Sequence, residues 1–189
     1  SDHAAFYVWT GSRFAADAEL VMRKLGLLLH REIVWVKPSM RLTHSGQYHW
    51  RHETAKYSWV EGKAPLWFGD LTQTSVWEFP CDPPPTVHPT QKPIEVYRRP
   101  ILNHMEAGWV LYDPFGGGGT AVIASELHAQ TPILARSIEL SPVYVAATIQ
   151  RFQALSKVEP ILLSGPEVDR PTPMSSLPTR QPDPEKESA

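Results

Sequence analysis

A run of four glycines, Gly116 to Gly119, is the part of the sequence with the clearest capacity for chemistry. Glycine lets a backbone turn sharply and approach a ligand closely, and the N–H groups of a following helix point at that ligand. Glu139, about 20 residues beyond Gly118, has the spacing of a carboxylate that binds the two hydroxyls of a ribose. The pattern predicts a site for a nucleoside-containing cofactor and does not decide which one. The simpler alternatives are a tight turn without a ligand and a solvated carboxylate.

The elements that must position these residues alternate along the chain. Runs of β-forming residues predict strands at residues 4–9, 32–37, 54–60, 109–112, 132–138 and 160–163. Helical periodicity predicts helices at residues 12–24, 93–105, 120–128 and 142–157. The glycine run then lies between a strand and a helix. This alternation predicts an α/β fold with a mainly parallel sheet.

Several local signals predict where these elements begin and end. We expect Ser12 to cap the first helix, Gly26 to end it, and Pro38 to end the second strand. The stripe of the first helix that should face the core consists of Phe14, Ala18, Val21 and Leu25. Residues 1–163 form one expected domain, and the Pro-rich residues 164–189 are an expected disordered tail.

Composition narrows the class of protein. The chain has 189 residues, of which 42% are hydrophobic and 20% charged, as in ordinary globular domains. No apolar run is long enough for a membrane helix, and the start lacks the pattern of a signal peptide. A single cysteine, Cys81, excludes an internal disulfide framework and fits a reducing cytoplasm. We therefore expect a cytoplasmic protein with no membrane partner.

Basic and aromatic side chains are interleaved between residues 23 and 63, as on surfaces that meet phosphates and unstacked bases. The candidate DNA-binding residues in this stretch are Lys37, Arg41, His44 and Arg51. The alternative is a solvated face beside a core strand. Histidine spacing here matches no common zinc site and Cys81 has no partner cysteine, so we expect no metal.

Two motifs resemble those of one enzyme family. The sequence DPFGGGGT, residues 113–120, is similar to the DPFxGxGT cofactor motif of DNA methyltransferases that modify exocyclic amines. The sequence HPTQKP, residues 88–93, resembles the element that precedes this motif in the subgroup with permuted motif order. The stretches EIVWVKP at 32–38 and HWRHETAKYSWVEG at 49–62 also resemble the subgroup. The likeness runs from about residue 4 to 163.

The resemblance implies a Rossmann-like fold that binds S-adenosylmethionine. The implied cofactor-binding residues are Asp113, Phe115, Gly116, Gly118, Thr120, Glu139, His88, Thr90 and Lys92. Asp113 would pair with the ammonium of the cofactor, Glu139 with its ribose and Lys92 with its carboxylate. An alternative for residues 88–93 is a helix entry, with Thr90 as the cap and Lys92 solvated.

The resemblance also implies a catalytic loop of the form [D/N/S]-P-P-[Y/F/W], which holds the amine of a base flipped out of the duplex. In permuted enzymes this loop precedes the strand expected at residues 4–9, so we expect no catalytic residue in this chain. The similar run at residues 82–85, DPPP, lacks the aromatic residue and is interpreted as a Pro-rich loop.

The strand before that loop should lie mid-sheet, between the strands at 4–9 and 109–112. We therefore expect a fold that is incomplete at its N-terminus, lacking its central strand. A missing N-terminal segment or a second chain would have to fill the gap.

The leading hypothesis is part of a bacterial or phage DNA methyltransferase of a restriction-modification type. It would transfer a methyl group to an adenine or cytosine amine in double-stranded DNA, and this chain alone would be inactive. One alternative is a degenerate remnant that binds cofactor or DNA without catalysis. Another is a nicotinamide-dependent oxidoreductase, favoured only by the loose glycine pattern.

Overall fold

The computed structural model describes residues 3–41, 47–80, 91–128, 132–164 and 171–176. Strands and helices alternate through most of this part, so the α/β fold is confirmed. The first group of strands is β1 (Phe6–Thr10), β2 (Leu27–Arg41), β3 (Trp50–Val60) and β4 (Val76–Glu78). The second group is β5 (Val110–Asp113), β6 (Leu134–Ser137), β7 (Ile161–Leu162) and β8 (Thr172–Pro173). The helices are α1 (Ala15–Lys24), α2 (Glu95–His104), α3 (Thr120–Glu126) and α4 (Pro142–Ser156).

Strands β1 to β4 form one sheet in the order β1-β3-β2-β4. Strand β3 runs antiparallel to both β1 and β2, whereas β4 pairs in parallel with β2. The prediction of a mainly parallel sheet is therefore wrong for this part of the molecule. Strands β2 and β3 follow each other without a helix between them, and parallel neighbours need a long crossover connection. They form a hairpin instead.

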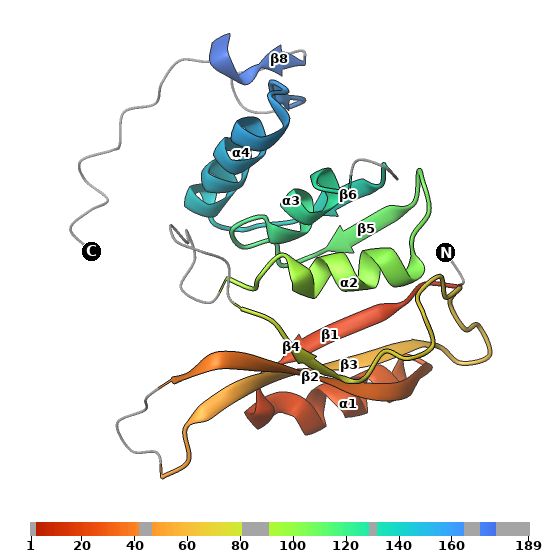
Figure 1. Cartoon of the computed structure of the whole chain (residues 1–189). Coiled ribbons are helices and arrows are strands. Elements are labelled where there is room, and N and C mark those ends of the chain that lie inside the picture. Colours follow the sequence, from red (N-terminus) through yellow and green to blue (C-terminus); the bar gives the residue numbers. More distant parts are fainter. Residues whose placement is uncertain (1–2, 42–46, 81–90, 129–131, 165–170, 177–189) are drawn as a thin grey trace.

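This hairpin is longer than the sequence predicts. Strand β2 continues through Pro38 to Arg41, and β3 begins at Trp50 instead of residue 54. The β2–β3 register is irregular between Val36 and Arg41, which is where Pro38 lies. Proline lacks an N–H group and is tolerated where a ladder is interrupted, so it does not end the strand. In Figure 1 the two strands extend past the other strands of their sheet. We call residues 36–41 and 47–52 the hairpin arm.

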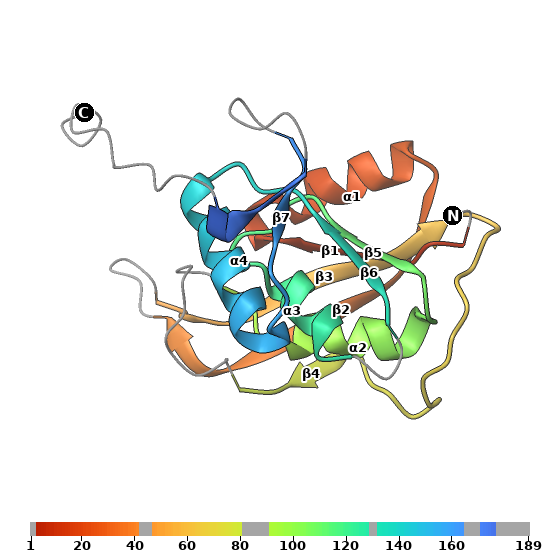
Figure 2. The ribbon, with the colours of Figure 1, turned by 90° about the horizontal axis from the view of Figure 1, so that it is seen from above.

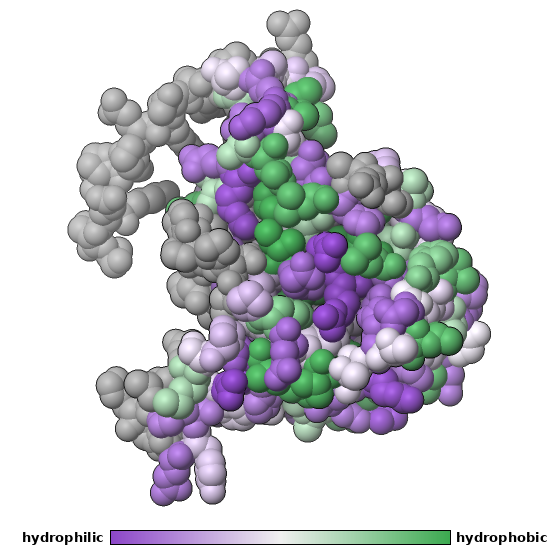
Figure 3. Space-filling view, viewed as in Figure 1, coloured by the Kyte–Doolittle hydropathy of each residue, from purple (hydrophilic) through white to green (hydrophobic). Residues whose placement is uncertain are grey.

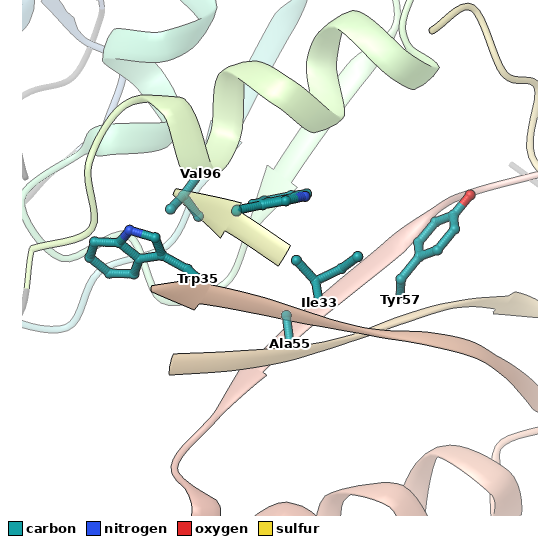
Figure 4. Close-up of a cluster of buried hydrophobic side chains, with 6 residues drawn as sticks. Ile33, Trp35, Ala55, Tyr57 and Val96 are labelled. Carbon is teal, nitrogen blue, oxygen red and sulfur yellow. The ribbon is translucent and has the colours of Figure 1, made fainter. Parts of the chain in front are cut away.

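A dense core covers one face of the four-stranded sheet. Ile33 and Trp35 of β2, Ala55 and Tyr57 of β3, and Val96 of α2 are at least nine-tenths buried, and Figure 4 shows the strand residues pointing toward the helix. Alternate residues of a strand point to the same face, which explains the i, i+2 spacing within each strand. The core thus fixes α2 over this sheet.

Helix α1 lies on the opposite face of the sheet (Figure 1). A short 3-10 turn, Ser12–Phe14, precedes it, and no side chain caps either element, so the prediction of Ser12 as a cap is wrong. Met22 is the buried residue of α1, whereas Phe14, Val21 and Leu25 are more than half exposed. The predicted core stripe is therefore wrong as well. Gly26 follows the helix with a φ of 76°, as predicted for the residue that ends it.

Strands β5 and β6 form a separate parallel pair with α3 between them in sequence. A second buried cluster contains Ile101 of α2, Ala124 of α3 and Ile133 beside β6. Tyr97 of α2 packs against both this cluster and the core of the four-stranded sheet. Helix α2 therefore connects the two sheets by side-chain packing.

Strands β1 and β5 are edge strands. Within the described residues, β1 pairs only with β3 and β5 pairs only with β6. The arrowheads of β1 and β5 point the same way in Figure 1, and Figure 2 shows them overlapping when the molecule is viewed from above. Each strand thus keeps one edge without a described ladder partner.

Part of the Pro-rich segment is ordered, which its composition did not predict. Strand β8 pairs antiparallel with β7, and the N–H groups of Met174 and Ser175 donate to Pro160 and to the carboxylate of Glu159. These specific bonds hold residues 172–176 against the end of the domain. Strand β8, within the Pro-rich residues 164–189, thus contacts the last strand of the expected domain.

Candidate functional site

The glycine run forms the turn between β5 and α3, as the sequence predicts. Gly117 and Gly119 have φ angles of 51° and 75°, in the left-handed region that side chains disfavour. A Cβ on Gly119 would lie 2.3 Å from Cγ2 of Thr148 in α4. Glycine is required at position 119 both by the backbone angle and by the contact with α4.

The other predicted loop residues differ in exposure. Gly116, Gly118 and Thr120 are buried, whereas the side chain of Phe115 is 85% exposed. The Gly116 N–H donates to the carbonyl of Ile138 at 2.8 Å, which ties the loop to the end of β6. The exposed ring of Phe115 thus lies next to the Gly116 backbone, which is held by its hydrogen bond to Ile138.

Asp113, at the end of β5, is engaged at both carboxylate oxygens. Its Oδ1 accepts the N–H of Phe115 at 3.0 Å, and its Oδ2 accepts the hydroxyl of Tyr97 at 2.8 Å. Burial and the negative charge of Asp113 raise the pKa of Tyr97 well above its usual range. The Tyr97 hydroxyl therefore keeps its proton and remains a donor to the carboxylate.

Glu139 lies just beyond β6 and faces the glycine loop. Its Oε2 accepts the N–H of Gly117 and its Oε1 accepts the N–H of Ser141, both at 2.7 Å. One carboxylate thus holds both the glycine loop and the residue before α4.

Helix α4 holds the loop from a further side. The Thr148 hydroxyl lies 3.4 Å from the carbonyl of Gly117, and Arg151 donates to the carbonyl of Gly118. Sequence reasoning missed Tyr97, Thr148 and Arg151. Thr148 and Arg151 are three residues apart and share a helix face, but nothing in the sequence indicates that this face meets the glycines. For Tyr97 the sequence gave a weak indication that the ring packs inward, because Tyr97 shares a helix face with Ile94 and Ile101.

Lys92 lies beside the four-stranded sheet. Its Nζ is 3.1 Å from Glu53 Oε2 and lies over the ring of Trp9, while Lys37 Nζ is 2.6 Å from Glu53 Oε1. Burial opposes ionisation of Glu53, but the hydrogen bond from Lys37 and the charge of Lys92 hold its pKa below the usual range. Lys37, a predicted DNA contact, and Lys92, a predicted cofactor contact, thus form ion pairs with the same carboxylate. Of the other residues predicted in the HPTQKP motif, His88 and Thr90 lie outside the described residues.

The predicted DNA-binding residues lie on the hairpin arm. Arg51 is exposed and donates from Nε to the carbonyl of Lys37 at 3.2 Å. Arg41 ends β2 with its side chain outside the described atoms, and His44 lies outside the described residues. Tyr48 is 93% exposed and Trp50 half-exposed on the same arm. Figure 3 shows mostly hydrophilic and intermediate side chains along it, at the lower left.

One other cavity lies away from the glycine loop. A cavity of about 570 Å³ lies between residues 68–74 and α2, and none of its lining residues belongs to the glycine loop. Across the described part of the chain, no three His, Cys, Asp or Glu side chains gather as metal ligands would. Nor does any helix there have the length and apolar character to span a bilayer.

Comparisons with known proteins find similarity to methyltransferases, although no family model matches the chain. The type II methyltransferase M2.MboI of Moraxella bovis is 30% identical across 50% of this chain. The match spans 40% of that relative's length.

Solved structures resemble the chain over a longer stretch. A complex of M1.HpyAVI with SAM matches 80% of this chain and 76% of its own, with a TM-score of 0.65 and 22% identity. The PvuII DNA methyltransferase, which is cytosine-N4-specific, matches 80% of this chain and 64% of its own, with a TM-score of 0.68 and 18% identity. The chain therefore has the α/β fold of these DNA methyltransferases over about 80% of its length.

Proposed function

We propose that this protein is the cofactor-binding and DNA-facing part of an S-adenosylmethionine-dependent DNA methyltransferase acting on an exocyclic amine. The main support is the glycine loop between β5 and α3, with Asp113 and Glu139 at the carboxyl ends of neighbouring parallel strands. Ligands of open α/β sheets bind at the carboxyl ends of the strands. The similarity to M2.MboI and to the fold of M1.HpyAVI agrees with this assignment.

The chemistry of the loop fits S-adenosylmethionine. The cofactor has an ammonium, a carboxylate and a ribose but no phosphate, and the loop offers two carboxylates beside a glycine turn. Asp113 would accept the ammonium, and Glu139 would accept ribose hydroxyls. Phe115, with its exposed ring, would border the pocket. When bound, the cofactor supplies the methyl group on a sulfonium, and this chain's residues hold and orient it.

Lys92 fits its predicted role less directly. Its ammonium forms an ion pair with Glu53, so contact with a cofactor carboxylate would have to use another of its three N–H donors. We retain Lys92, His88 and Thr90 as proposed cofactor contacts on the basis of the HPTQKP resemblance. Lys37 is a weaker candidate for DNA than Arg51, because Glu53 offsets its charge.

Double-stranded DNA would meet the hairpin arm. Arg51 supplies exposed positive charge, and Tyr48 and Trp50 supply exposed rings that can stack on unpaired bases. The arm extends beyond the sheet at the end toward which the β1 and β5 arrows point in Figure 1. The residues proposed to bind the cofactor and those proposed to bind DNA would thus lie at the same end of the molecule.

The working enzyme would contain one further strand between β1 and β5. Support comes from the open edges of both strands, their common direction, and the bridging position of α2. That strand would carry the loop that accepts the hydrogens of the target amine and stacks on the flipped base. It would come from an N-terminal segment or from a second chain.

Calorimetric titration tests the cofactor assignment. S-adenosylmethionine should bind the protein with measurable heat, and Asp113→Ala should remove most of it because the ammonium loses its charged acceptor. NAD should give no heat, since the loop offers two carboxylates to a cofactor rich in phosphate. Binding of NAD without a response to S-adenosylmethionine would contradict the proposed function and favour an oxidoreductase.

A further inference from the structure

Tyr97 occupies an unusual position for a hydroxyl group. It lies in the first turn of α2 and packs against both buried clusters, yet its hydroxyl reaches the carboxylate at the end of β5. The distance from Tyr97 Oη to Asp113 Oδ2 is 2.8 Å, which is a usual length for an O–H···O hydrogen bond. Tyr97 thus joins the helix that bridges the sheets to the residue that begins the glycine loop.

The two hydrogen bonds on Asp113 together restrict its side chain. Phe115 N–H fixes Oδ1 from the loop itself, and among the described residues this local bond is the one that the carboxylate would retain without Tyr97. A short local bond of this i, i+2 type also occurs in ordinary turns and leaves the second oxygen free to turn toward water. The Tyr97 bond comes from another element and therefore sets the rotamer of Asp113 before any ligand arrives.

We propose that Tyr97 is a positioning residue of the cofactor site, holding the Asp113 carboxylate in the orientation that receives the ammonium of the cofactor. The assignment rests on the proposed function above. Preorganisation of this kind improves affinity because the ligand does not have to order the residue that binds it. Tyr97 itself does not touch the cofactor in this scheme and acts through Asp113.

The test is a titration series with two ligands. S-adenosylmethionine carries the ammonium, whereas 5′-methylthioadenosine has the same nucleoside without the amino-acid group. Tyr97→Phe removes one hydroxyl and keeps the packing ring, so it should weaken S-adenosylmethionine binding by about tenfold. It should leave 5′-methylthioadenosine binding unchanged. Tyr112→Phe, on the exposed part of β5, is the matched control and should change neither affinity.

A double-mutant cycle adds a second criterion. If Tyr97 acts through Asp113, Tyr97→Phe should have almost no further effect in the Asp113→Asn background, because the charged acceptor is already gone. Equal weakening of both ligands by Tyr97→Phe, or additive losses in the cycle, would overturn the assignment. Normal S-adenosylmethionine binding by Tyr97→Phe would also overturn it and leave the proposed function intact. Absence of binding by the unmodified protein would contradict the proposed function itself.

Discussion

At the scale of single residues, the carboxylates of the site have structural partners as well as a proposed ligand. Asp113 holds the start of the glycine loop, and Glu139 holds Gly117 and Ser141. Loss of either carboxylate therefore affects the protein even without a cofactor. The two bonds that Glu139 accepts distinguish it from the solvated strand-end carboxylate that the sequence left open.

Glu139→Ala should lower both stability and cofactor affinity. It leaves two backbone N–H groups without their acceptor, and each unsatisfied donor costs about 1–3 kcal/mol where water cannot reach it. Glu139→Gln keeps one acceptor oxygen and should lose less stability. Thermal and urea unfolding of the free protein, followed by calorimetry, measure both effects. Unchanged stability in Glu139→Ala would show that the two bonds contribute nothing.

The residue types of the site could be predicted, but their neighbours could not. The glycines and Glu139 were found because their spacing along the chain matches a strand–turn–helix unit, and Asp113 was found from the resemblance of DPFGGGGT to a family motif. Tyr97, Thr148 and Arg151 meet that unit from other helices, and such contacts depend on how helices pack, which local sequence does not encode. The partner of Lys92 could not be predicted for the same reason, since Glu53 lies on a different sheet from the glycine loop.

At the scale of elements, the turn from β5 to α3 depends on backbone angles that few residues adopt. Gly119 has a positive φ and contacts Thr148 of α4 closely, so two separate penalties arise when a side chain is added there. Two other glycines help to distinguish the cost of the backbone angle from the cost of the close contact. Gly26 has a φ of 76° and open space around it, and Gly11 has open space without a positive φ.

Replacing each of these glycines by alanine should give a graded series. Gly11→Ala should be nearly neutral, and Gly26→Ala should cost about 1 kcal/mol from the left-handed angle alone. Gly119→Ala should cost more than Gly26→Ala, because Thr148 and α4 must also move. Urea unfolding of the three variants gives the order. A Gly119→Ala variant as stable as Gly26→Ala would mean that α4 moves away without cost.

The elements themselves were easier to predict than their ends. The strands at β1, β5 and β6 and helices α2 to α4 lie close to the predicted ranges because periodicity and flanking glycine or proline identify them. Strands β2 and β3 were predicted too short, since Pro38 and the polar residues near Trp50 are typical of loops. Pairing between the two strands outweighed those local preferences.

At the scale of the whole molecule, two sheets share a helix but no described backbone ladder. The four-stranded sheet ends at β1 and the smaller pair ends at β5, and α2 packs on both. Unpaired strand edges invite pairing with another strand. The proposed additional strand would satisfy both edges at once.

Methyl transfer should therefore require more than these 189 residues. The chain alone should give no incorporation of tritiated methyl groups into mixed genomic DNA, because a flipped base needs stacking and hydrogen bonds that offset an unpairing cost of about a few kcal/mol. A version extended upstream in the gene should restore incorporation. The Asp82→Ala variant is the control for the similar DPPP run. Strong incorporation by the chain alone, abolished by Asp82→Ala, would place the catalytic loop in that run.

The hairpin of β2 and β3 has a consequence for how the chain reaches its structure. Its two strands are neighbours in sequence, so only a short loop must close before they pair, whereas β5 and β6 cannot pair until α3 has crossed over between them. We expect the hairpin to form first and β1 to join it next. Helix α2 should then contact the glycine loop late, so that the proposed cofactor site forms only in the completed fold.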